Sequence, residues 1–236
     1  MDLKKISPDQ VIYHDWGVFD LNATLVFTWA VMALLVIASI VITAKLSTGE
    51  KMSRWQNLLE IVVSYMRKEI GEIAHSNADR YVPLIGTLFI FILVSNVLNV
   101  VPYFISPTAS LSTTAALAIC VFFSVIIYGV LERGIGGYLK QYIQPTPLML
   151  PFNIIGEFSR TLALAVRLFG NMMSGAKIVA ILLAVTPFIF PVVMNLLGLL
   201  TGVIQAYIFA VLAMVYIASA TRRQQEQKQS GGNQNG

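Results

Sequence analysis

Two long stretches of this 236-residue chain contain no charged residue. The first runs from Val82 to Leu131, and the second runs from Ile178 to Thr221. One small core cannot bury such runs, whereas a bilayer can, because about 20 apolar residues span its hydrocarbon layer. Only 12% of the residues are charged, against roughly 25% in soluble domains. The sequence therefore predicts an integral membrane protein.

Five apolar segments are long enough to span a bilayer as helices, which predicts an all-α fold with one membrane domain over residues 21–220. The segments cover about 22–44, 82–101, 112–131, 152–186 and 188–220. Residues 52–74 alternate charged and apolar positions at helical spacing, which is typical of an amphipathic interfacial helix. About 35 residues of helix extend about 52 Å, well beyond a hydrocarbon thickness of about 30 Å. The last two segments are therefore expected to form a long, tilted hairpin.

The positive charges predict the orientation. They follow the first, third and last spans, whereas loops 102–111 and 186–191 have none. The positive-inside rule then puts the C-terminus in the cytoplasm and the polar N-terminal segment 1–20 outside. The low-complexity tail 221–236 is expected to be disordered.

Several classes of function find no support in the sequence. The single cysteine, Cys120, excludes an intramolecular disulfide, and His14 and His75 belong to no cluster of metal ligands. The net charge of +4 fits membrane orientation better than nucleic-acid binding. Without a G-x-x-x-x-G-K-[ST] loop the chain is not expected to bind ATP itself. We expect no metal, no cofactor and no catalytic residue.

The fourth predicted span carries a narrow polar stripe. On a helix its members fall within roughly 80° of one another: Asn153, Glu157, Arg160, Arg167 and Asn171. Such a stripe should face protein or water rather than lipid. Glu157 and Arg160 are three positions apart, so a local ion pair is the ordinary interpretation. Lys177 lies off the stripe and either reaches toward the outer surface or lines an access channel.

Arg167 has no acidic residue within four positions on its helix. The only acid between positions 141 and 221 is Glu157, ten residues away. A guanidinium inside a membrane needs a carboxylate partner. The partner of Arg167 is therefore expected on another protein.

The last predicted span also carries a polar face, formed by Asn195, Gly198, Gly202 and Gln205. The two glycines form a G-x-x-x-G motif, which lets another helix approach closely. Two interpretations stay open. The face is either a packing seam with Gln205 as a hydrogen-bonding group, or one wall of a polar contact around Arg167.

These residues resemble a known family. RLFGNMMSG at 167–175 and IQAYIF at 204–209 are similar to the two signature helices of subunit a of the bacterial F-type ATP synthase. Residues 91–102, 106–119 and 151–171 extend the resemblance, which covers roughly residues 80–220.

The resemblance implies a non-catalytic, ion-translocating stator subunit in the bacterial inner membrane. Arg167 would face a rotating ring of c subunits, each with one essential carboxylate, and Asn171 and Gln205 would lie near it. Asn153, Glu157, Arg160, Lys177 and Asn195 would support the polar stripe or the half-channels. The implied partners are the c-ring, subunit b of the peripheral stalk and the translocated proton or sodium ion.

Two departures leave the ion path open. Many relatives have an acid or histidine where this chain has Ala176, and some have a histidine at the position of Gly198. The path would then rely on water with Asn96, Asn99 or Asn195, or carry sodium. The alternatives are an ion-coupled secondary transporter, which would need its own intramembrane carboxylate, and a passive scaffold subunit.

Overall fold

The computed structural model describes residues 12–15, 20–44, 54–74, 78–101, 104, 106–143, 148–185 and 190–232. Five helices within these ranges are long and apolar enough to cross a membrane. Their apolar windows are Thr24–Ile42, Val82–Val100, Leu111–Glu132, Met149–Leu182 and Val192–Thr221. The prediction of an all-α membrane protein with five spans is confirmed. The connection at 186–189, part of a predicted turn, lies outside the described residues.

A short strand pair precedes the first helix, and the sequence did not predict it. Strand β1 (Ile12–Asp15) pairs antiparallel with β2 (Asp20–Asn22). Strands this short show no period-two pattern, so hydrophobic periodicity does not reveal them. The remainder of the predicted segment 1–20 lies outside the described residues.

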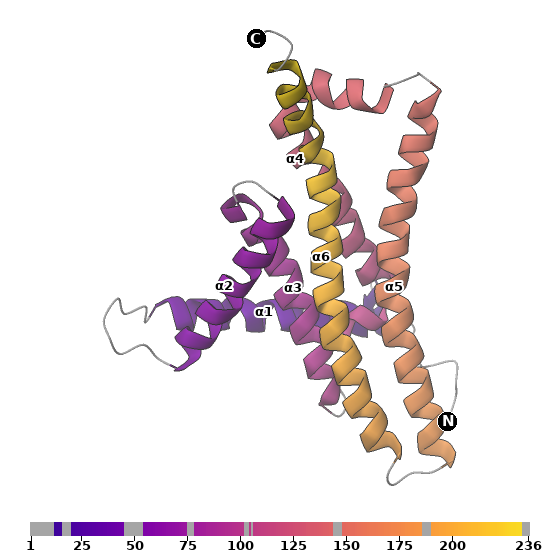
Figure 1. Ribbon diagram of the computed structural model, residues 1–236. Coiled ribbons are helices and arrows are strands. Elements are labelled where there is room, and N and C mark those ends of the chain that lie inside the picture. Colours follow the sequence, from indigo (N-terminus) through magenta and orange to yellow (C-terminus); the bar gives the residue numbers. More distant parts are fainter. Residues whose placement is uncertain are drawn as a thin grey trace.

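The long hairpin consists of α5 (Met149–Val185) and α6 (Phe190–Gly232), which lie side by side and antiparallel (Figure 1). The 37 residues of α5 extend about 55 Å. By contrast, the 21 residues of α1 (Ala23–Thr43) extend about 31 Å, the thickness of a hydrocarbon core. Helix α1 runs across the direction of the hairpin (Figure 1). A bilayer that α1 crosses upright is therefore crossed obliquely by α5 and α6, in agreement with the predicted tilt.

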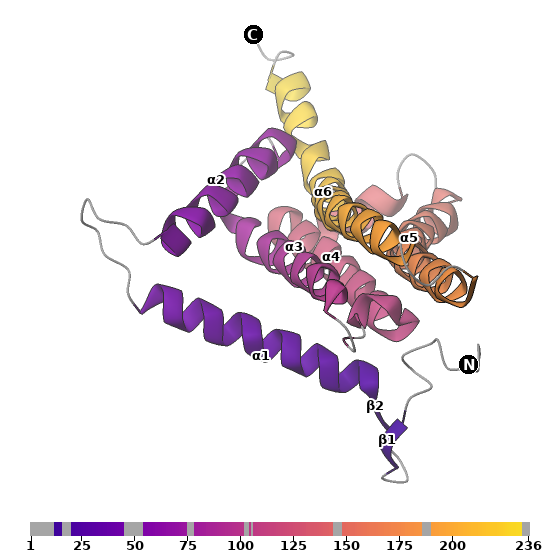
Figure 2. The same ribbon diagram turned by 90° about the horizontal axis from the view of Figure 1, so that it is seen from below.

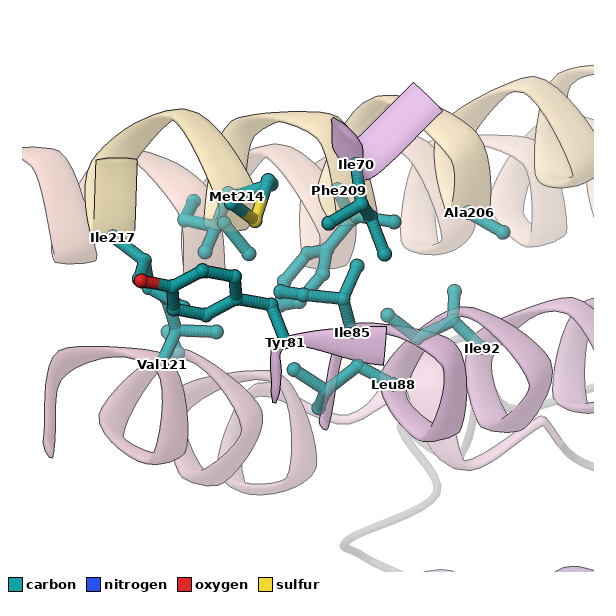
Figure 3. Close-up of a cluster of buried hydrophobic side chains, with 14 of the residues drawn as sticks. Ile70, Tyr81, Ile85, Leu88, Ile92, Val121, Ala206, Phe209, Met214 and Ile217 are labelled. Atoms are coloured by element: carbon teal, nitrogen blue, oxygen red, sulfur yellow. The ribbon is translucent and has the colours of Figure 1, made fainter. Parts of the chain in front are cut away.

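Helix α6 is the centre of the packing. Helices α3 (Val82–Val97) and α4 (Leu111–Ile143) lie between α1 and the hairpin (Figure 2), and α2 (Arg54–Ala74) packs beside α3 and α6. The buried cluster contains side chains from four helices (Figure 3): Ile70 of α2, Ile85 and Ile92 of α3, Val121 of α4, and Phe209, Met214 and Ile217 of α6. Small residues of α6, such as Ala206, Ala210 and Ala213, are also buried. They allow the close approach that drives helix association in lipid.

Helix α4 continues past its predicted end at residue 131 because a glycine redirects it. Gly134 adopts a φ of 72°, and the helical segment beyond it leads across to α5 (Figure 1). The turned segment places Tyr138, only 8% exposed, against the preceding helix. A Cβ atom at Gly129 would lie 2.6 Å from Cε2 of the Tyr138 ring. The two glycines therefore contribute to the same bend of α4. Gly134 adopts the backbone conformation of the bend, and Gly129 leaves space for the Tyr138 ring.

Three 3₁₀ turns complete the described fold: η3 (Ala78–Arg80), η4 (Leu98–Val100) and η5 (Pro107–Ala109). Ion pairs join η3 to the neighbouring helices. Arg67 Nε lies 2.8 Å from Asp79 Oδ1, and Arg80 Nη1 lies 2.6 Å from Glu132 Oε1. The second pair connects the start of α3 to α4.

Helix α6 continues from Thr221 to Gly232, past the predicted end of the last span at residue 220. The segment TRRQQEQKQS is rich in arginine, glutamine, glutamate and lysine, which are good helix formers. Extending an existing helix also avoids the unfavourable nucleation step.

Candidate functional site

Arg167 lies near the middle of α5 on an outward face. Its neighbours Leu164 and Leu168 are buried, with 1% and 0% of their surface exposed, and they attach one face of the helix to the bundle. Arg167 points away from this face and is exposed. Within the part of the chain that the structure describes, no carboxylate or hydrogen-bond acceptor pairs with it. The five N–H donors of its guanidinium therefore have no acceptor among the described residues.

Glu157, the acidic residue of the stripe, has an ion-pair partner on its own helix. Arg160 Nη1 lies 3.7 Å from Glu157 Oε2, which confirms the predicted local ion pair. The Glu157 side chain is 17% exposed and that of Arg160 is 53% exposed. Glu157 therefore has a cation of its own one turn along the helix. Asn153 lies one turn before it on α5 and is partly buried.

Asn171 connects the two helices of the hairpin. Its Nδ2 lies 3.5 Å from the carbonyl oxygen of Thr201 on α6. Because the two helices are antiparallel, the residue one turn before Asn171 on α5 lies at the same level as the residue one turn after Thr201 on α6. Those positions are Arg167 and Gln205. Gln205 is 7% exposed, and its amide has no hydrogen-bond partner among the described residues.

Lys177 and Asn195 lie nearer the end of the hairpin at which the chain turns from α5 to α6. Both side chains are exposed, and neither pairs with another group in the described ranges. They thus lie apart from the Asn171 contact and from the Glu157–Arg160 pair.

The G-x-x-x-G motif suggested that both glycines allow another helix to approach, but only one of them has a close neighbour. A Cβ at Gly202 would lie 3.0 Å from Cβ of Asn96 on α3, whereas a Cβ at Gly198 would meet nothing within 4 Å. Gly202 therefore provides space for the Asn96 side chain. No atom of α5 is among those that a Cβ at either glycine would meet first, so the motif is not the seam between α5 and α6.

The model of the family described as ATP synthase A chain matches residues 25–218. The chain belongs to this family. It is 60% identical over 225 residues to "ATP synthase subunit a 2" of Acaryochloris marina (strain MBIC 11017), covering 95% of this chain and 96% of the relative.

Other members of the ATP synthase A chain family are similarly close. The chain is 59% identical to "ATP synthase subunit a 2" of Picosynechococcus sp. (strain ATCC 27264 / PCC 7002 / PR-6), with 96% of this chain and 97% of the relative covered. It is 57% identical to "ATP synthase subunit a" of Albidiferax ferrireducens, with 96% and 98% covered. As a member of this family, the chain is a multi-pass, non-catalytic membrane subunit, as the sequence predicted. The secondary-transporter alternative is not favoured.

The structure of this family member adds buried polar residues that the sequence analysis did not single out. They lie at the turn between α3 and α4: Ser95, Ser106, Thr108 and Ser110, each at most 1% exposed. Thr108 Oγ1 donates to Asn96 Oδ1 at 2.7 Å, and Ser106 Oγ donates to the carbonyl of Ser95 at 3.0 Å. The hydroxyl-rich segment SPTASLS, which contains no charge, was the available signal. The sequence analysis placed this segment largely within loop 102–111, and nothing in its pattern indicated that its side chains are buried.

A second contact across α6 was also missed. Tyr207 Oη donates to Glu69 Oε2 of α2 at 3.0 Å. The amphipathic helix α2 therefore lies against α6 through a polar bond as well as through Met66 and Ile70, which are buried. Among the described residues, no group of three or more His, Cys, Asp or Glu side chains could hold a metal ion.

Proposed function

We propose that this subunit forms the stator side of the ion path in a rotary ATP synthase, with Arg167 as the charge that faces the c-ring. The observation that carries the proposal is the exposed Arg167 guanidinium, which no described carboxylate of the chain neutralises. A cation at this position within a membrane-spanning helix is costly unless an anion meets it. A ring carboxylate would supply that anion, once per c subunit.

The mechanism follows from the properties of the two charges. An ion enters through a half-channel from outside and neutralises a ring carboxylate, which can then rotate into lipid. After nearly a full turn the carboxylate meets Arg167 and releases its ion to the cytoplasmic half-channel. Each charge that crosses gains about 2.3 kcal/mol per 100 mV, and this gain drives rotation. Rotation in turn drives ATP synthesis, or ATP hydrolysis drives the reverse pumping, in the partner subunits.

Arginine suits this role because a guanidinium stays protonated when it is desolvated, whereas a lysine could lose its charge. The fixed charge attracts each ionised carboxylate and repels cations that would leak between the half-channels. In this proposal Asn171 and Gln205 lie next to the contact between Arg167 and the ring carboxylate. Asn171 is one turn after Arg167 on α5, and Gln205 is beside Arg167 on α6. Lys177 and Asn195 lie toward the outer half-channel, and Asn153, Glu157 and Arg160 toward the cytoplasmic one.

The proposal includes the setting. The N-terminal segment 1–20 is outside, the tail beyond Thr221 is in the cytoplasm, and the membrane is the bacterial inner membrane. The positive charges that follow the first, third and last spans support this orientation. The c-ring and subunit b of the peripheral stalk are the proposed neighbours.

The test is ATP-driven ion uptake in vesicles that contain the whole complex, with native protein and with Arg167→Gln. Arg67→Gln is the matched control, because its ion pair with Asp79 is more than half exposed and such pairs contribute little. We expect Arg167→Gln to abolish uptake while ATP hydrolysis by the detached soluble sector persists, and Arg67→Gln to pump normally. Repeating the assay with and without sodium identifies the ion. Coupled pumping by Arg167→Gln would refute the stator role and favour a passive scaffold.

A further inference from the structure

One turn of α6 is bonded from both sides by side-chain amides. On one flank, Asn96 Nδ2 of α3 donates to the carbonyl oxygen of Gly202 at 2.8 Å. On the other, Asn171 Nδ2 of α5 lies 3.5 Å from the carbonyl oxygen of Thr201, the preceding residue. Within an α-helix these two carbonyls also accept the N–H groups of residues 205 and 206. The turn that leads to Gln205 is thus tied to two neighbouring helices.

The Asn96 amide is held in one orientation. Thr108 Oγ1 donates to Asn96 Oδ1 at 2.7 Å, so the NH₂ group must point the other way, toward Gly202. Thr108 is itself within 2.7 Å of Ser106 Oγ, whose hydroxyl lies 3.0 Å from the carbonyl of Ser95. The turn between α3 and α4 therefore fixes the direction in which Asn96 donates. Asn96 is 2% exposed and Thr108 is 0% exposed, so water does not compete for these bonds.

Gly202 makes the contact sterically possible. Any Cβ there would approach Asn96 Cβ to 3.0 Å and its Cγ and Nδ2 to 3.4 Å. The 3.0 Å distance is tighter than ordinary carbon contacts of about 3.5–4.0 Å. The absence of a side chain at Gly202 and the amide of Asn96 are therefore complementary parts of one contact.

We propose that Asn96 is a positioning residue for ion translocation, which holds the Thr201–Gly202 turn of α6 so that Gln205 stays level with Arg167. Asn96 is too buried to line an aqueous path, in contrast to the half-channel role considered for it from sequence. It acts instead through the Gly202 carbonyl. Small displacements at a reacting pair are costly, because a shift of about 1 Å can slow a reaction by about 100-fold. The inference rests on the proposed function of Arg167.

The experiment compares whole complexes in vesicles that carry Asn96→Leu, Thr108→Val or Thr114→Val. Thr114 is the matched control, since it is also 0% exposed but its hydroxyl bonds to Leu111 within its own helix. Two quantities are measured: the rate of ion transport per assembled complex, and the ion concentration that gives half-maximal ATP synthesis, read as a pH if protons are carried. Loss of assembled complex alone would lower the total rate and leave both of these quantities unchanged.

We expect Asn96→Leu to lower the rate of ion transport per assembled complex by about tenfold and to shift the half-maximal ion concentration. Thr108→Val, which keeps the amide but frees its orientation, should show a smaller change in the same direction, and Thr114→Val should match native protein. If Asn96→Leu does not assemble, the comparison of Thr108→Val with Thr114→Val decides. Native values for Asn96→Leu, or equal losses in both threonine variants, would overturn the inference.

Arg167→Gln, measured in parallel, separates this inference from the proposed function. If Arg167→Gln abolishes transport while Asn96→Leu behaves as native, only the positioning role fails. If Arg167→Gln still pumps with full coupling, the stator role itself fails.

Discussion

Replacing Gly129 by alanine tests how the corner of α4 is packed. The new methyl group would lie 2.6 Å from Cε2 and 2.9 Å from Cδ2 of Tyr138, and 3.6 Å from Cβ of Ala220. Carbon atoms normally stay about 3.5–4.0 Å apart, so the ring must move by about 1 Å. Because Tyr138 is only 8% exposed, the ring has little free space. Overpacking of this kind costs about 1–3 kcal/mol.

The same substitution at Gly86 is the control. Gly86 also lies inside a helix, and a Cβ there would meet nothing within 4 Å. Both substitutions gain about 1 kcal/mol of helix propensity, so this gain cancels in the comparison. Gly129→Ala should therefore be less stable than Gly86→Ala by about 1–3 kcal/mol.

The assay is the temperature at which the subunit is released from, or aggregates in, the purified complex in detergent. The midpoint for Gly129→Ala should lie clearly below that for Gly86→Ala. Adding Tyr138→Leu should reduce the effect of Gly129→Ala, because the two residues are in contact and their effects are not additive. Equal midpoints for the two alanine variants would refute the packing of Tyr138 against Gly129.

Three further outcomes are expected. Tyr207→Phe removes the hydroxyl that donates to Glu69 and should loosen α2 by about 1 kcal/mol, seen as faster proteolysis within α2. The Glu69 carboxylate beside Tyr65 raises the pKa of the Tyr65 hydroxyl from its ordinary value of 10.0. The resulting stability is complete below that value and is lost as the pH rises through the raised pKa. Glu69→Gln should move the tyrosinate absorbance of Tyr65, identified by subtracting a Tyr65→Phe titration, to lower pH, and an unchanged titration would contradict this. Arg80→Glu or Glu132→Arg alone should lower stability by up to about 1 kcal/mol. The double reversal should restore it, and high salt should weaken all three effects.

The membrane spans were predictable because the bilayer imposes a simple rule on composition. Residues 82–131 and 178–221 carry no charge, and helix is the economical way to bury their backbone in lipid. The isolation of Arg167 was predictable for a related reason. With one acid between positions 141 and 221, and with that acid paired to Arg160 in the structure, no local partner remained.

The contacts around α6 were not predictable, since they join residues far apart in the chain. Asn96 and Gly202 are separated by 106 positions, and no helical period relates them. The G-x-x-x-G motif indicated close approach at both glycines, yet only Gly202 has a neighbour. A motif read on one helix cannot say which other helix fills the space. At Gly134 a φ of 72° lets α4 turn and continue, whereas the apolar pattern alone ended this span at residue 131.

The length of α5 has a geometric consequence for any ion that travels along it. A rod of 37 residues is about 55 Å long, and if its ends lie at the two faces of a layer about 30 Å thick, they are offset sideways by about 46 Å. An ion that enters at one end and leaves at the other cannot pass straight through the membrane. It must be carried sideways between the two openings, and a moving neighbour is the means by which a static, oblique helix can achieve this.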